Sequence, residues 1–309
     1  MSKSIYTYVA IFMVATGWLV SSCSDQLDVT MTEAIYGEYI KFNSSVNSYS
    51  GKTRTQTRSM GNNISSEEDE WLYCDKQNGV TRGTPVTSIN DSVGLIGYKL
   101  PEGTSMDDTK ISWNKMTNQK YILEGDELRA ATAPIPWSTI DSNESLKVYA
   151  YSPYQQSTDT KITGIPTLNF TVGNEITKQA DLIIADTIVK PADHKKNISL
   201  TFKHILTAIR FKAHFKCTVL SITVKNIKNS GTYTYGKGWK VNDEELTDYT
   251  ISFGEDGKVF EKDSLITFEA NTMMMIPQTL TEDAEVELAY IPDGGSEKKT
   301  ISASLYGKV

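Results

Sequence analysis

The thiol of Cys23 is the group whose sequence surroundings most clearly predict a chemical modification. It ends the run Val20-Ser21-Ser22-Cys23, which follows an apolar stretch from Ile5 to Val20 and a positive charge at Lys3. Small residues before the cysteine let such a peptide enter a signal protease, and the thiol is the group that receives diacylglycerol. We therefore predict that residues 1–23 are a lipoprotein signal peptide with a lipobox and that Cys23 carries the lipid.

A transmembrane helix is the alternative for the same apolar stretch. Thr7, Thr16 and Gly17 interrupt it, and it is shorter than the roughly 20 apolar residues that a bilayer span needs. Residues 24–35 are polar and without periodicity, which predicts a tether. The expected location is the outer membrane, at the cell surface, with the lipid as the membrane contact.

The remaining cysteines and the histidines predict no metal or cofactor. Cys74 and Cys217 form one disulfide or remain two buried thiols, and both possibilities stay open. Neither has a Cys or His at ligand spacing. His194, His204 and His214 are ten residues apart, which on one strand would separate them by about 33 Å.

No catalytic motif is complete. Ser112-Trp113-Asn114-Lys115 fits the pattern Ser-x-x-Lys, but the partner motifs of that chemistry are missing. A carboxylate pair for glycoside hydrolysis needs a cleft, which a sequence does not show. We therefore expect no enzyme. Four tryptophans offer either a sugar-stacking platform or ordinary core residues: Trp71, Trp113, Trp137 and Trp239.

Composition limits the number of domains and the kinds of partner that the chain can have. The 309 residues allow one large domain or two ordinary ones. A hydrophobic fraction of 39% with sixteen tyrosines is enough for real cores. The net charge is −7, and no basic cluster offsets it. We expect no nucleic-acid partner, because phosphate binding needs a concentrated basic surface.

Apolar residues alternate with polar ones in several short runs, which is typical of half-buried strands. Gly, Asn and Pro separate the runs, and no helical periodicity lasts ten residues. The predicted fold class is all-β, built as β-sandwiches. The predicted strands are residues 146–151, 167–172, 209–215, 220–224, 286–290 and 301–305.

A weaker first strand is predicted within residues 36–50, from the alternation of Tyr39, Lys41, Ser44 and Val46. The stretch 51–63 that follows holds almost nothing apolar, which predicts an exposed loop.

Six blocks of sequence, taken together, resemble the fimbrillin-like (Mfa-like) lipoproteins of Gram-negative gut and oral anaerobes. Their order and spacing carry the resemblance, because each block alone is weak. They are Arg82-Gly83-Thr84-Pro85-Val86, the stretch from Tyr149 to Tyr154, the stretch from Pro166 to Val172, the stretch from Gln179 to Ala185, the stretch from Leu200 to Phe211, and Met275-Ile276-Pro277-Gln278.

The resemblance implies a non-enzymatic fimbrial subunit, tip or anchor with two β-sandwich domains of transthyretin-like topology. In such pili a protease cuts after an arginine behind the first strand, and a strand of a neighbouring subunit fills the groove. Arg54 and Arg58 lie where the family would place the cut. The implied partners are other fimbrial subunits. The alternative is a stand-alone surface lipoprotein that binds a glycan or a host ligand.

The resemblance also sets expectations for domains and modification. We expect an N-terminal domain over residues 36–193 and a C-terminal domain over residues 194–309. The C-terminal domain is expected to lack its last strand, because relatives continue past this point. Short Asp-Ser/Thr-apolar patterns resemble the O-glycosylation signal of these anaerobes and point to Ser92, Thr187 and Ser264, with plain turn residues as the alternative.

Overall fold

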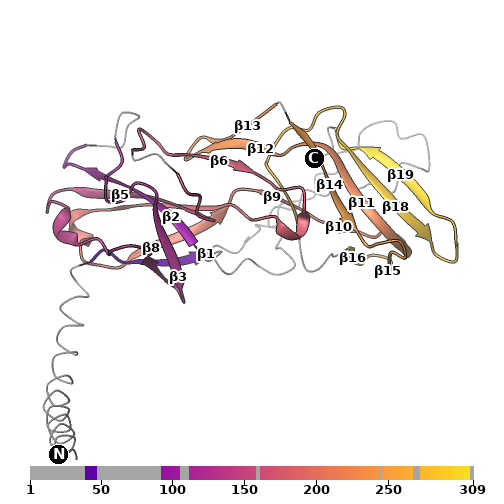
Figure 1. Cartoon of the computed structure of the whole chain (residues 1–309), viewed down its shortest axis with the longest axis horizontal. Coiled ribbons are helices and arrows are strands. Elements are labelled where there is room, and N and C mark those ends of the chain that lie inside the picture. Colours follow the sequence, from indigo (N-terminus) through magenta and orange to yellow (C-terminus); the bar gives the residue numbers. More distant parts are fainter. Residues whose placement is uncertain are drawn as a thin grey trace, which may run out of the picture.

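The computed structural model describes residues 39–46, 92–104, 111–157, 161–243, 245–266 and 272–306. The molecule is elongated, with the first strands at one end and the last strands at the other (Figure 1). The described residues form strands and three short 3₁₀ turns, with no α-helix. The all-β prediction is confirmed, and the layered sheets are consistent with a sandwich-like arrangement. The transthyretin-like topology stays a prediction.

Seven strands at the N-terminal end form one sheet that closes on itself. Its neighbours are antiparallel, except that β1 runs parallel to β8. In spatial order the strands are β1 (Phe42–Val46), β4 (Glu127–Ala130), β3 (Gln119–Glu124), β2 (Ser92–Leu100), β5 (Ser145–Ser152), β7 (Ile183–Val189) and β8 (Ile198–His204).

Strand β2 is buried on both faces. Val93 and Leu95 belong to one hydrophobic core, whereas Ile96 and Tyr98 belong to another. This double burial explains why β2 is apolar almost throughout instead of alternating. Gly94 fits here because a Cβ atom would lie 2.3 Å from the ring of Tyr151.

The C-terminal end is organised around the long strand β11 (Cys217–Lys228). Strands β14 (Leu246–Ser252) and β15 (Lys258–Phe260) pair with one side of it, and β18 (Glu285–Pro292) pairs with the other. Strand β19 (Lys299–Ser304) continues the sheet beyond β18. Within the part of the chain that the structure describes, no strand pairs with the outer side of β19.

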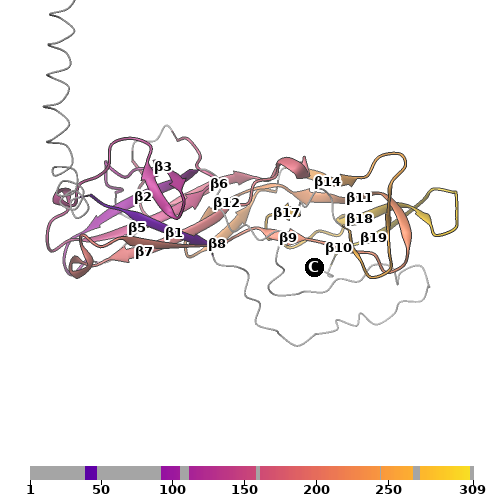
Figure 2. The same ribbon diagram turned by 90° about the horizontal axis from the view of Figure 1, so that it is seen from below.

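A third sheet joins segments far apart in sequence. Strand β12 (Ser230–Thr234) lies between β6 (Thr167–Thr171) and β13 (Gly238–Val241), and the three lie over the middle of the molecule (Figure 1). Figure 2 shows the same molecule from below. Two short pairs complete the fold: β9 (Thr207–Ile209) with β17 (Met273–Met275), and β10 (Phe211–Lys212) with β16 (Leu265–Ile266).

The predicted strand over residues 209–215 is wrong as a single element. The chain leaves β9 at Ile209 and enters β10 at Phe211, and the two strands belong to different sheets. Arg210 therefore marks a change of partner. Ile209 and Phe211 are half-buried, and Phe215 is 36% exposed.

The predicted domain boundary between residues 193 and 194 stays a prediction. Strand β8 follows this boundary in sequence, yet it pairs with β7 and β1 of the closed sheet. One core lies inside the closed sheet, and the other runs from β2 and β5 to β19. Strands β2, β5 and β7 therefore contribute side chains to both cores.

Candidate functional site

Strand β1 completes the closed sheet between β4 and β8. The position that β1 occupies between these two strands is the candidate functional site, and we call it the β1 seat. Its register with β8 runs from Phe42 opposite Ile198 to Val46 opposite Phe202. On the other side, only Phe42 and Asn43 pair with β4. Strand β1 is therefore held along its length by one neighbour and at its start by two.

Two apolar side chains anchor this segment in the core. Ile40 and Phe42 are 4% and 1% exposed, and the Phe42 ring meets the ring of Tyr121 edge to face at 5.5 Å. Burying a side chain of the size of phenylalanine contributes about 1.5–3 kcal/mol. The rest of β1 is Asn43, Ser44, Ser45 and the half-buried Val46. The strand is thus short, mostly polar and fixed at one end.

Two polar atoms at the seat are buried without a hydrogen-bond partner among the described residues. They are the side-chain oxygen of Asn43 and the hydroxyl of Tyr121. Burial raises the pKa of Tyr121 well above its usual range. Such atoms are rare in native interiors and destabilise the arrangement that leaves them unpaired. The seat is therefore imperfectly complementary to the strand that occupies it.

The predicted first strand lies in the right region, but its burial pattern was read incorrectly. The expected alternation used Tyr39, Lys41, Ser44 and Val46, whereas the deeply buried residues are Ile40 and Phe42. A shift of one residue moves every side chain of a strand to the other face. Cys23, Arg54, Arg58 and Cys74 lie outside the described residues.

The structure does not bring the predicted modification sites together. Ser92 opens β2, and Thr187 lies in β7 opposite Val148, both in the closed sheet. Ser264 lies before β16 at the other end of the molecule, and its hydroxyl donates to the carbonyl of Glu261 at 2.6 Å. All three are half-buried, so their modification stays a prediction.

The tryptophans that the structure describes are in core positions. Trp137 is 4% exposed and stacks on the ring of His194, and Trp113 packs against the core of the closed sheet. Trp239 packs on Tyr233, and its indole nitrogen donates to the carbonyl of Ile205 at 2.8 Å. These packing contacts favour the alternative of ordinary core residues, and a sugar-stacking platform stays a prediction.

Ser112 has a structural role. Its hydroxyl accepts a hydrogen bond from the Ile162 amide at 2.9 Å and lies 2.8 Å from the Thr117 hydroxyl.

Cys217 is buried, and burial raises the pKa of its thiol. Whether Cys217 pairs with Cys74 stays open. Within the described ranges, no three His, Cys, Asp or Glu side chains are grouped to hold a metal ion.

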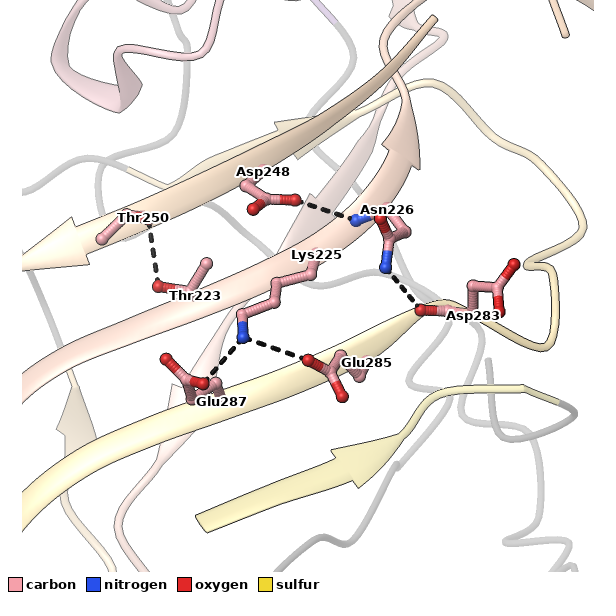
Figure 3. Close-up of polar contacts among 8 residues, drawn as sticks. All are labelled: Thr223, Lys225, Asn226, Asp248, Thr250, Asp283, Glu285 and Glu287. Atoms are coloured by element: carbon pink, nitrogen blue, oxygen red, sulfur yellow. Dashed lines mark hydrogen bonds and ion pairs between the residues drawn. The ribbon is translucent and has the colours of Figure 1, made fainter. Parts of the chain in front are cut away.

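A polar network on the C-terminal sheet was not predicted (Figure 3). The ammonium of Lys225 on β11 lies 2.7 Å from Glu287 and 3.1 Å from Glu285, both on β18. Hydrogen bonds to these two carboxylates raise the pKa of Lys225. On the other side of β11, the hydroxyls of Thr223 and Thr250 lie 3.0 Å apart. These side-chain contacts between adjacent strands stabilise the register in which β11 pairs with β14 and β18.

Asn226 marks a bulge in the same strand. Its backbone has a φ of 59°, and the β14 register shifts between Val224 and Ile227. The backbone N–H of Asn226 donates to the Asp248 carboxylate at 3.0 Å. The side-chain amide of Asn226 donates to the backbone carbonyl of Asp283 at 2.8 Å. Asparagine tolerates this left-handed conformation better than most residues, so a bulge signal was present in the sequence.

The closed β-sheet is completed by the short strand β1. A model of the fimbrillin-like family matches residues 81–306. This match covers well over half of the chain, and the chain belongs to the fimbrillin-like family. The family is of a non-enzymatic kind, and its proteins are of the fimbrial, cell-surface type.

Three solved structures are similar to this chain, and all are described as putative cell adhesion proteins. One, from Bacteroides ovatus, is 14% identical, with a TM-score of 0.47, over 86% of this chain and 85% of that one. A second, from Bacteroides uniformis, is 16% identical, with a TM-score of 0.44, over 73% and 82%. A third, from Bacteroides thetaiotaomicron, is 14% identical, with a TM-score of 0.38, over 85% of each. No curated protein matches the chain.

No helix in the described part of the chain has the length and apolar character to cross a bilayer.

Proposed function

We propose that this protein is a lipid-anchored surface subunit of a fimbria that joins its neighbours by exchanging the strand at the β1 seat. The observation that carries the proposal is the nature of β1: a short polar strand, with two deep anchors, that completes an otherwise continuous closed sheet. Membership of the fimbrillin-like family supports the same reading.

Removal of β1 would expose two kinds of unsatisfied surface at once. The backbone groups of β8 that now pair with β1 would lose their partners, and the sites of Ile40 and Phe42 would open to water. Unpaired strand edges and open apolar sites favour the binding of another strand. An incoming strand that lacks the unpaired side-chain oxygen of Asn43 would be more complementary to the β1 seat than β1 is.

The processing site is proposed at Arg54 or Arg58. Both lie between Val46 at the end of β1 and Ser92 at the start of β2, so a cut there would free β1 without breaking the rest of the closed sheet. The cut would also separate Cys23 from the body of the protein. Such a release suits a shaft or tip subunit, whereas an anchor subunit would remain uncut.

The test is cleavage of the purified chain with an arginine-specific protease, followed by mass spectrometry and measurement of oligomer size. We expect a stable cut after Arg54 or Arg58 and the appearance of larger species. The matched control replaces both residues (Arg54→Gln, Arg58→Gln) and should show no cut at these two positions and form no larger species. A wild-type chain that is cut cleanly yet stays monomeric, even with full-length relatives present, would favour the stand-alone glycan- or host-binding lipoprotein.

A further inference from the structure

The β1–β8 pair is the only parallel pairing among the strands that the structure describes. In a parallel pair, the N-terminal end of one strand and the C-terminal end of the other lie at opposite ends of the ladder. Here the chain enters β1 at its N-terminal end and leaves β8 at its C-terminal end, after His204, toward β9 and the C-terminal sheets.

Strand β1 also runs along the long axis of the molecule. It begins near the outer end of the closed sheet and points toward the middle, and β8 runs beside it in the same direction (Figure 2). The C-terminal sheets lie beyond that middle. A pull between the segment before β1 and the far end of the molecule would therefore act along the axis of β1.

Tension of this kind loads the pair in shear. The ladder bonds lie across the strands, so sliding β1 along its axis strains all of them together. A pull at the same end of both strands would instead break the bonds one after another. Each bond is weak by itself, so breaking them together requires a higher force than breaking them in sequence.

The anchoring contacts at the start of β1 oppose the same sliding motion. The Ile40 amide donates to the Ile135 carbonyl at 2.8 Å, the Ile198 amide donates to the Lys41 carbonyl at 2.9 Å, and the Ser44 amide donates to the Asp126 carbonyl at 2.8 Å. To slide, β1 would also have to draw the ring of Phe42 away from Tyr121 and out of the core.

We propose that β1 is the load-bearing strand of this protein: it transmits tension from the segment that precedes it to the body of the molecule through a shear-loaded parallel pair. The proposal depends on the proposed surface anchoring only for the direction of the pull. It adds a mechanical role to a strand that the proposed function treats as removable.

Single-molecule force spectroscopy on the isolated chain tests the proposal, with one handle on the thiol of Cys23 and Cys74→Ser to remove a competing thiol. Cys217 is buried and stays unlabelled. The second handle is placed by Lys203→Cys at the far end of β8, or by Asn197→Cys just before β8; both positions are exposed. The first pair of handles loads β1 and β8 in shear, and the second pulls both strands at the same end.

We expect the peak force for detaching β1 to be several-fold higher with the Lys203→Cys handle than with the Asn197→Cys handle. Phe42→Ala should lower the shear force, and the control Ser199→Ala, at an exposed position of β8, should leave it unchanged. Equal forces in the two geometries would overturn the proposal, whether or not Phe42→Ala folds. Because the chain is measured in isolation, the result is independent of whether cells anchor it at Cys23.

Discussion

The carboxylate of Asp181 and the imidazole of His204 are in direct contact, and their side chains are only 1% and 5% exposed. Asp181 lies before β7, and His204 ends β8, opposite Ile183. The pair therefore joins the last strands of the closed sheet, where the chain turns toward the C-terminal half. A histidine that sequence spacing alone gave no role thus has a buried acidic partner.

Loss of one member of this pair should destabilise the fold strongly. Removing one partner of a buried hydrogen bond typically costs about 1–3 kcal/mol, and more where a charged group is involved, and we expect a loss of at least that order for Asp181→Ala in urea denaturation. Asp181→Asn keeps an acceptor and separates the effect of charge from that of the hydrogen bond. The matched control is Glu175→Ala, which breaks the exposed pair with Lys178 and should cost far less, because exposed ion pairs contribute little to stability. Similar losses for Asp181→Ala and Glu175→Ala would contradict the expectation.

Phe202 and Phe211 should differ although both lie in strands, β8 and β10. Phe202 is fully buried in the closed sheet, whereas Phe211 is only partly buried against the other core. Phe202→Ala should lower the free energy of unfolding by about 3–5 kcal/mol. Phe211→Ala should cost clearly less, because its side chain already contacts water. Equal losses in denaturant titrations would show that the half-buried position of Phe211 is misassigned.

The bulge at Asn226 should depend on the backbone conformation of that residue. Left-handed φ values cost most side chains about 1–2 kcal/mol, so Asn226→Ala should destabilise the protein by about that amount, in addition to the loss of its bond to Asp283. Asn226→Gly removes the same bond without the conformational cost and should lie between Asn226→Ala and wild type. Thermal unfolding of the two variants measures the difference. A glycine variant less stable than the alanine variant would be inconsistent with this account.

The proposed lipid anchor can be tested in cells. Cys23→Ala removes the thiol that would receive the lipid, and the variant should move from the detergent-extracted membrane fraction to the soluble periplasmic fraction. Ser22→Ala is the control, because alanine is also small and should preserve processing. Cys23→Ala protein that still partitions into detergent would exclude Cys23 as the anchor.

Alternation of side chains predicted the strand content well, because it is a local property. Strands β6, β11, β18 and β19 follow the predicted alternation, with Leu168 and Phe170 buried in β6 as expected. The same reading could not show that β2 and β5 are buried on both faces, or that Ile209 and Phe211 belong to different sheets. Those facts depend on which distant strands pack on each side, and no local pattern encodes them.

The candidate site was predicted in position but not in detail. A first strand behind a polar loop was visible in the sequence, whereas the parallel pairing of β1 with β8 joins residues more than 150 positions apart, as Ser45 and Thr201 illustrate. The buried partner of His204 and the ion pairs of Lys225 were missed for the same reason. Their partners come from other parts of the chain, and only the folded sheets bring them together.

The pairing of β6 with β12 restricts how genes of this kind can exchange segments by recombination. Any crossover between residues 172 and 229 would place β6 of one parent against β12 of the other. The two strands are matched by side chains as well as by backbone, because the hydroxyl of Thr232 on β12 donates to the side-chain oxygen of Asn169 on β6 at 2.7 Å. Exchangeable cassettes should therefore begin before β6 or after β13, so that this small sheet is inherited whole.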